Sequence, residues 1–139
     1  MKIIAMIPAR LGSQRVPRKN LRLLNGKPLI SYSIEAAKKA ACFDEIYVNS
    51  EADILGEIAI DHGVSFYKRP AQHASNTAIN DDFAYDFVQN VPGDVLVQLL
   101  PTSPLITPEE IAQFVAEMKS GKWDTLVSVN DHQIACVYN

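Results

Sequence analysis

Cysteine and tryptophan are scarce in this chain of 139 residues, which contains two cysteines and one tryptophan. Cys42 and Cys136 lie far apart and form no metal-binding or redox motif, so both are predicted to be small apolar core residues. No apolar run approaches the ~18 residues that a membrane-spanning helix needs. The apolar stretch at the start of the chain is too short for the apolar region of a signal peptide. A cytoplasmic protein that does not associate with membranes is the simplest expectation.

Acidic residues are missing from the first 34 residues, although the whole chain has a net charge of −3. That segment carries seven Lys and Arg residues, whereas the rest of the chain carries six, together with all sixteen acids. A local basic patch on an acidic protein indicates a small polyanionic ligand, because a nucleic-acid-binding domain usually presents a whole basic face. A solvated basic loop is the alternative interpretation.

Strand-like apolar runs alternate with amphipathic helical segments along the chain. The predicted strand at residues 2–7 is continuously apolar after Lys2, which is typical of a strand buried on both faces of a parallel sheet. The alternation predicts an α/β fold in which helices cover both faces of a mainly parallel sheet, a three-layer α/β/α (Rossmann-like) arrangement. The predicted strands are 2–7, 45–49, 64–67, 94–100, 125–129 and 134–138, and the predicted helices are 28–41, 52–62, 78–90 and 108–120.

The spacing of apolar residues also predicts which helix faces are buried. Thr107-Pro108-Glu109-Glu110 is a capping box with proline at the first helical position, and Gly121 is expected to end the helix that follows it. The residues expected to face inward in the second and third helices are Ile54, Leu55, Ile58 and Ala59, and Ile79, Phe83, Phe87 and Val88.

A polar loop of unusual length, residues 8–27, follows the first predicted strand. Ligands of such sheets bind beyond the carboxyl ends of the strands, so this loop is a candidate binding segment. Glycine lets the backbone approach an anion, hydroxyl and backbone N–H groups donate to phosphate oxygens, and arginine and lysine neutralise phosphate charge. The loop residues that offer these groups are Arg10, Gly12, Ser13, Arg15, Lys19 and Asn20.

Two common phosphate-binding motifs are absent from this loop. The Walker A spacing of Gly-x4-Gly-Lys-Ser/Thr does not occur, because Gly26-Lys27 is followed by Pro28. The Gly-x-Gly-x-x-Gly fingerprint of dinucleotide-binding folds is also missing. The ligand is therefore expected to bind a different kind of loop.

The loop resembles the N-terminal signature of the acylneuraminate cytidylyltransferases, Ile-Pro-Ala-Arg-x-Gly-Ser-Lys-x-x-Pro-x-Lys-Asn, at residues 7–20. Four further segments resemble the family in order and spacing. Residues 25–37 resemble its first helix and 43–50 its second strand, while 69–78 resemble its base-binding loop and 99–105 its sugar-facing segment. The resemblance covers nearly the whole chain and implies a nucleotidyltransferase fold.

The resemblance implies that the chain joins CTP to an acidic nine-carbon sugar and releases pyrophosphate. Arg10 and Lys19 would be the catalytic cations, and Thr102 and Ser103 would lie near the sugar. It further implies Mg²⁺ as the cofactor and a homodimer as the full-length assembly. The nucleotide-binding residues would be Ala9, Arg10, Gly12, Ser13, Arg15, Lys19 and Asn20 from the loop, with Arg69, Ser75, Thr77 and Asn80 near the cytosine and ribose.

Four positions depart from the family pattern. Gln14 stands where lysine is usual, and Asn76 replaces a frequent aspartate. Leu100 takes the place of the glutamine in Gln-Pro-Thr-Ser-Pro, and Ile106 that of an arginine. The last two changes favour a relative of N-acetylneuraminate, a different sugar acid, or reduced activity.

The sequence leaves other interpretations open. A sugar nucleotidyltransferase for a shorter acid such as Kdo is one alternative, although residues 16–20 favour the acylneuraminate branch. A nucleotide-binding homologue without catalysis is another. Residues 1–139 are predicted to form one nucleotide-binding domain, truncated at its C-terminus, and no metal ligand is assigned within them. Asp94 is expected to be a solvated turn acid rather than a metal ligand.

Overall fold

A four-stranded parallel sheet forms the centre of the molecule in the computed structural model, which describes residues 1–129. The strands lie in the order β5-β4-β1-β6. Strand β1 pairs with β4 on one side and β6 on the other, with Ile7 opposite Val48 and Ala5 opposite Val97. The bounds of these strands are β1 Ile3–Pro8, β4 Glu45–Ser50, β5 Ser65–Lys68 and β6 Val95–Gln98.

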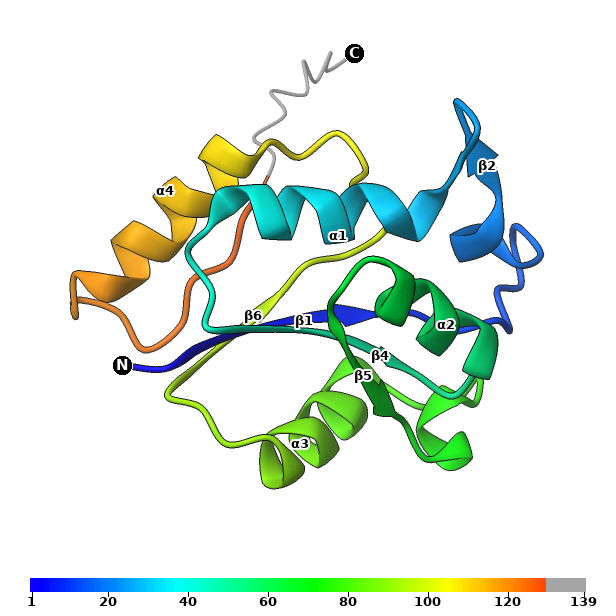
Figure 1. Cartoon of the computed structure of the whole chain (residues 1–139). Coiled ribbons are helices and arrows are strands. Elements are labelled where there is room, and N and C mark those ends of the chain that lie inside the picture. The colour runs from blue at the N-terminus through cyan, green and yellow to red at the C-terminus, as the bar shows by residue number, and fades with distance from the viewer. Residues whose placement is uncertain (130–139) are drawn as a thin grey trace, which may run out of the picture.

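Four helices cover this sheet from both faces (Figure 1). Helices α1, α2 and α4 pack on the face that carries Ile3, Ala5 and Ile7. Helix α3 packs on the opposite face, which carries Ile4 and Met6. The predicted three-layer α/β/α arrangement is therefore confirmed. The helices are α1 Leu29–Ala40, α2 Asp53–Asp61, α3 Asn80–Asn90 and α4 Pro108–Lys119. Within residues 1–129 none of them is long and apolar enough to cross a membrane.

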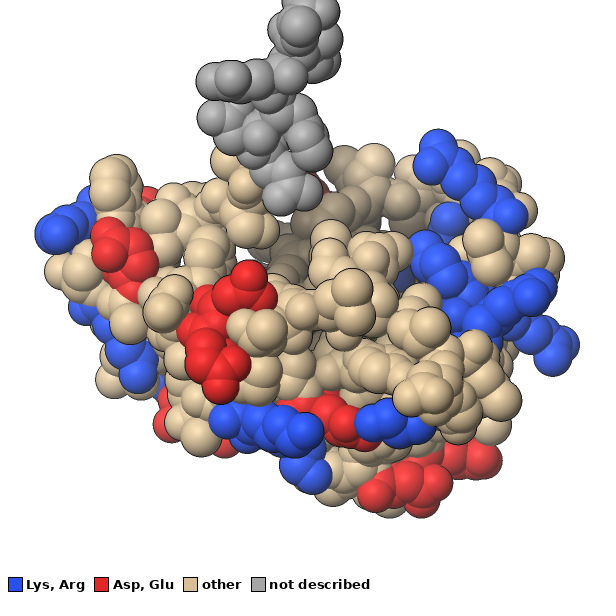
Figure 2. Space-filling model, turned by 90° about the horizontal axis from the view of Figure 1, so that it is seen from above, with Lys and Arg blue, Asp and Glu red and all other residues tan. Residues whose placement is uncertain are grey.

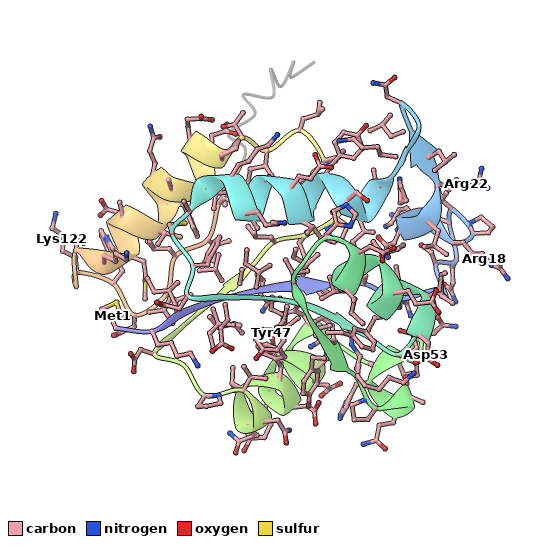
Figure 3. The ribbon with its side chains drawn as sticks, in the orientation of Figure 1. Met1, Arg18, Arg22, Tyr47, Asp53 and Lys122 are labelled. Atoms are coloured by element: carbon pink, nitrogen blue, oxygen red, sulfur yellow. The ribbon has the colours of Figure 1, made fainter. Side chains whose placement is uncertain are left out.

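An aromatic cluster fixes α3 against the sheet. The ring of Phe87 makes edge-to-face contacts with Tyr47 and Tyr67, at centroid distances of 5.4 and 5.1 Å. Tyr47, labelled in Figure 3, lies between the sheet and α3. The hydroxyl of Tyr67 donates to Asp86 Oδ2 at 2.7 Å. Burial and this carboxylate raise the pKa of Tyr67 to about 12, so its phenol stays protonated at neutral pH.

The predicted capping box at the start of α4 is confirmed. Thr107 Oγ1 accepts from the backbone N–H of Glu110 at 3.2 Å, and the Glu110 carboxylate accepts from the backbone N–H of Thr107 at 2.8 Å. These bonds satisfy N–H groups that the first turn of a helix leaves unpaired. Gly121 follows the helix with a φ of +73°, as expected for its end.

The long loop after β1 contains more regular structure than the sequence analysis predicts. A short 3-10 turn η1 spans Lys19–Leu21, and a hairpin joins β2 (Leu23–Leu24) to β3 (Lys27–Pro28). Asn25 and Gly26 form its two-residue turn with φ values of 48° and 79°, the combination that favours an Asn-Gly pair. Pro28 pairs within β3, so α1 begins one residue later than predicted.

Three predicted inward positions are wrong. Ile54, Ile79 and Val88 are exposed at 42%, 60% and 42%. Ile79 precedes α3 as its N-cap and has no helical face, whereas Ile54 and Val88 lie beside buried neighbours but point to solvent. The spacing of apolar residues therefore predicted where these helices lie, but it predicted only some of the residues on their buried faces.

The predicted strand at residues 125–129 is also wrong, because these residues do not form a strand in the structure. A strand is defined by its hydrogen-bonded neighbour, and no segment within residues 1–129 supplies one there. The predicted strand 134–138, together with Cys136, lies outside the described residues. Cys42 is partly buried against the core as predicted, and burial raises the pKa of its thiol.

The first prediction concerns the core between α1 and the sheet. Ile34 is fully buried on α1, whereas Ile60 on α2 is 69% exposed. We expect Ile34→Ala to lower the free energy of unfolding by about 2–5 kcal/mol, because it leaves a cavity. Ile60→Ala removes the same atoms without a cavity and is expected to change it by less than about 0.5 kcal/mol. Urea unfolding followed by circular dichroism checks both, and equal losses would contradict the described burial.

Candidate functional site

The loops that follow the parallel strands meet at the carboxyl edge of the sheet and enclose a cavity of about 280 Å³. Such an edge is where ligands of open α/β sheets bind. Its walls come from the loop after β1, the residues after β5, α3 and the segment after β6. The lining residues are Pro8, Ala9, Arg10, Ser13, Lys19, Asn20, Arg69, Phe83, Leu100, Pro101 and Thr102.

Hydrogen bonds from the neighbouring strand hold the beginning of the β1 loop. The backbone N–H of Ala9 donates to the carbonyl of Asn49 at 3.0 Å. The backbone N–H of Leu11 donates to Glu51 Oε1 at 2.9 Å. The buried Asn20 side chain then donates from Nδ2 to the carbonyl of Arg10 at 3.1 Å. The loop is therefore fastened on both sides of Arg10, and Asn20 reaches the cavity as part of this fastening.

Arg10 connects the β1 loop with the loop that follows β5. Its Nη1 donates to the carbonyl of Ser75 at 3.1 Å and to Asn76 Oδ1 at 3.2 Å. A longer contact of 3.4 Å reaches the carbonyl of Ala74. The sequence analysis predicts that these two loops serve one site, and the structure brings them together through Arg10.

Arg69 is the most buried cation of the cavity, at 3% exposure. Its Nε donates to Asn49 Oδ1 at 2.7 Å and its Nη2 donates to the Asn49 carbonyl at 2.9 Å. Its Nη1 reaches the His73 carbonyl at 3.4 Å, and the guanidinium lies 4.1 Å from the ring centroid of Phe83. Burial lowers the pKa of Arg69 to about 10, so the group still carries its charge at neutral pH.

Several predicted residues lie beside the cavity rather than in its wall. Gly12 and Arg15 are exposed on the outer part of the loop. Ser75 and Thr77 form a turn, with their hydroxyl oxygens 3.1 Å apart, and Asn80 is exposed at the start of α3. The roles predicted for these five residues toward a nucleotide remain predictions.

The largest group of basic side chains lies at one end of the molecule. Figure 2 shows Lys and Arg concentrated at the end where the β1 loop and the β2–β3 hairpin lie. Arg18 and Arg22 point outward there (Figure 3). The predicted basic patch of residues 1–34 is therefore divided between outward-pointing arginines and the inner cations Arg10 and Lys19, which Arg69 joins from the residues after β5.

A second and larger cavity, of about 620 Å³, lies between the segment after β6 and α4. Thr102 lines both cavities, whereas Ser103 lines only the second. Apolar side chains form much of the second wall. They are Val97, Leu99, Leu105, Ile106, Ile111, Phe114 and Val129. That Thr102 and Ser103 contact a sugar remains a prediction.

The acidic residues do not form a metal site in the part of the chain that the structure describes. Among residues 1–129 no group of three or more His, Cys, Asp or Glu side chains comes together. Asp94 lies at the amino end of β6, where it accepts from the backbone N–H of Lys2 at 2.6 Å. It is exposed there, as expected of a turn acid, and it lies at the end of the sheet opposite the cavity.

Sequence reasoning missed Asn49, Glu51 and Phe83 as parts of this site. Asn49 and Glu51 stand at the carboxyl end of β4, next to the end of β1. The rule that parallel strands end at a common edge would have pointed to these residues. Phe83 carried no such signal, because its helical spacing predicts only a core position.

Comparisons with known proteins agree on one family. A family model described as cytidylyltransferase matches residues 4–136. A CMP-N,N'-diacetyllegionaminic acid synthase from Legionella pneumophila is 40% identical over 137 residues, 94% of this chain and 58% of that protein. An N-acylneuraminate cytidylyltransferase from Streptococcus agalactiae is 33% identical over 136 residues, 94% of this chain and 32% of that protein.

A solved structure agrees with the fold. CMP:2-keto-3-deoxy-manno-octonic acid synthetase complexed with CTP superposes with a TM-score of 0.76 at 27% identity. The match covers 86% of this chain and 48% of that one. The chain therefore spans about half the length of the solved relative and 58% of the Legionella protein.

The second prediction tests how Arg69 is held. Lysine cannot donate in a planar fork, so Arg69→Lys loses at least one of the two hydrogen bonds to Asn49. We expect the free energy of unfolding to fall by about 2–4 kcal/mol. Arg15→Lys, on the exposed loop, is the control and is expected to change it by less than about 0.5 kcal/mol. Urea unfolding measures both; a neutral effect of Arg69→Lys would mean that the fork is dispensable.

Proposed function

The chain belongs to the cytidylyltransferase family, and on that premise we propose that residues 1–139 form the nucleotide-binding domain of an enzyme that joins CTP to a nonulosonic, sialic-acid-like sugar acid. The observation that carries the proposal is the cavity at the carboxyl edge of the sheet. Arg10, Lys19 and Arg69 bring three cations to one space of about 280 Å³. A triphosphate is the small anion that such a concentration of charge suits.

Lys19 is the cation best placed to move onto a ligand. Its side chain lines the cavity and makes no hydrogen bond or ion pair with any residue from 1 to 129, whereas Arg10 and Arg69 are held by carbonyl and amide oxygens. Ser13 adds a hydroxyl donor beside it. We propose that Lys19, Arg10 and Arg69 together neutralise the triphosphate, with Arg69 on the side nearer the cytidine.

The proposed reaction is a substitution at the α-phosphorus of CTP. The anomeric hydroxyl oxygen of the sugar acid forms a bond to this phosphorus, and the bond to the bridging oxygen of the β-phosphate breaks. The electron pair leaves with pyrophosphate, and the hydroxyl proton passes to solvent or to a base. Positioning and charge neutralisation supply most of the rate enhancement in such a step. Arg10 and Lys19 would stabilise the negative charge that moves toward pyrophosphate.

Mg²⁺ is the proposed cofactor, and it would bind oxygens of the triphosphate. Residues 1–129 contain no cluster of three potential protein ligands, and Mg²⁺ commonly binds through one or two carboxylates together with substrate phosphates.

The proposed acceptor is a sugar acid with apolar substituents. Leu100 is exposed in the wall of the first cavity, and Ile106 lines the second. Both replace polar residues of the family pattern that the chain resembles. The relative at 40% identity is named for a diacetylated sugar acid, which agrees with an apolar wall. A Kdo-type acid is the alternative acceptor.

We also propose a cytoplasmic homodimer that binds neither nucleic acid nor membranes. Charge supports the expectation for nucleic acid and membranes: the largest group of basic side chains lies at one end of a chain that is acidic as a whole. A small anionic ligand requires only such a local patch. The dimer rests on the family resemblance alone.

The third prediction separates Lys19 from a lysine outside the cavity. We expect Lys19→Ala to weaken CTP binding about 10- to 100-fold, as for loss of a charged hydrogen bond. Lys38→Ala is the control, because Lys38 is exposed on α1 and donates to the carbonyl of His62. Isothermal titration with CTP measures both dissociation constants. Equal affinities of the two variants would remove Lys19 from the phosphate site.

The fourth prediction concerns the reaction itself. We expect pyrophosphate release when the full-length protein receives CTP, Mg²⁺ and one member of a panel of nonulosonic acids. ATP and GTP at the same concentration should release little, and Kdo should be a poor acceptor. A coupled phosphate assay provides the measurement. CTP binding without pyrophosphate release for any acid in the panel would favour a non-catalytic nucleotide-binding homologue.

A further inference from the structure

Arg69 is buried without a carboxylate partner. None of the ion pairs between residues described in the structure includes Arg69. Its hydrogen-bond acceptors are the amide oxygen of Asn49 and two backbone carbonyl oxygens, and its flat side rests on Phe83. A buried charge normally has a charged partner, because removal from water is costly. The arrangement therefore orients the guanidinium without neutralising it.

The acids closest to Arg69 are committed to other groups. Glu51 accepts from the backbone N–H of Leu11 at 2.9 Å and from Ser50 Oγ at 3.3 Å. Asp86 accepts from the Tyr67 hydroxyl at 2.7 Å. Both raise the pKa of Arg69, but less than burial lowers it, and the neighbouring Arg10 lowers it as well. Neither carboxylate forms an ion pair with Arg69 among the described residues, so no negative group contacts this guanidinium in the cavity wall.

Asn49 is the residue that makes this arrangement possible. It is fully buried at the end of β4 and presents its side-chain and backbone oxygens to two nitrogens of one guanidinium. Its backbone oxygen also accepts from the backbone N–H of Ala9, at the start of the loop after β1. An aspartate has nearly the same shape and could accept the same bonds, but it would form a buried ion pair.

We propose that Asn49 is a positioning residue that holds the Arg69 guanidinium in the wall of the cavity and, because its amide is neutral, leaves that positive charge available to an anionic nucleotide. The inference rests on the proposed CTP-binding function. The role of Asn49 at the end of β4 depends on its side chain being a neutral amide and not a carboxylate. The anionic group it serves is the phosphate chain.

The test is Asn49→Asp, the fifth prediction, with CTP and uncharged cytidine as probes. We expect CTP to bind on the order of tenfold more weakly, because the added charge offsets the field of Arg69. Cytidine, which has no phosphate, should bind within about twofold of its affinity for the unchanged protein. The variant should still unfold cooperatively on heating, since the fork remains bonded, although the contact of Asn49 Nδ2 with Met6 Sδ at 3.2 Å is lost. Titration calorimetry and NMR titration provide the affinities.

The matched control is Gln89→Glu, which makes the same amide-to-acid change on the exposed side of α3. It should leave both affinities unchanged. CTP affinity equal to that of the unchanged protein in Asn49→Asp would overturn the inference while leaving the proposed function intact. Equal losses for CTP and cytidine would also overturn it, since they would indicate a change of cavity shape. If the unchanged protein binds no CTP, the proposed function itself fails, and the inference with it.

A measurement on the unchanged protein tests the same point if the Asn49→Asp variant does not fold. The Nε–H of Arg69 is bonded to Asn49 Oδ1, so its NMR signal should be protected from exchange with water. Saturation with CTP should shift this signal while the protection persists. A signal that exchanges freely, or that CTP does not move, would overturn the inference.

Discussion

The fork between Asn49 and Arg69 is the interaction on which the geometry of the site depends. Through it the end of β4 binds the residue that follows β5, and the same backbone oxygen holds Ala9 after β1. Arg10 then extends the connection to the carbonyl of Ser75. Two loops separated by some sixty residues are thus fixed to one strand end, so the cavity is shaped before any ligand enters it. Preorganised charge of this kind needs no rearrangement as negative charge moves during a reaction.

The cations of the site divide into fixed and free groups. Arg69 and Arg10 are held by neutral oxygens, whereas Lys19 has an ammonium group on a flexible stem and no partner within residues 1–129. A planar guanidinium loses little freedom when a fork of acceptors holds it, and a lysine can follow a group that moves. This division suits the proposed substrate CTP, because its CMP part stays bound while its pyrophosphate part leaves.

Sequence reasoning succeeded where the signal is local. The apolar run of β1 and the capping box at Thr107 both depend on neighbours a few residues away, and both are confirmed. The misses depend on distant contacts. The exposed side of Ile79 and the absence of a strand at 125–129 are decided by what packs there, and the place of Asn49 beside Arg69 is decided by the pairing of β4 with β5. Only the edge rule for parallel sheets could have anticipated that last contact.

The position of Leu100 in the cavity wall bears on which acceptor the site would bind. An isolated exposed leucine needs no explanation, but this one lies in the wall of the cationic cavity, next to Pro101 and Thr102. Water against an apolar wall is displaced favourably by a ligand with an apolar group. A residue that hydrogen-bonds a hydroxyl would instead penalise an acceptor without that hydroxyl, because the residue would lose its partner. Under the proposed function, leucine here would remove that penalty, so we expect the wall to favour acceptors in which hydroxyl groups are replaced by hydrogen or acylated amines.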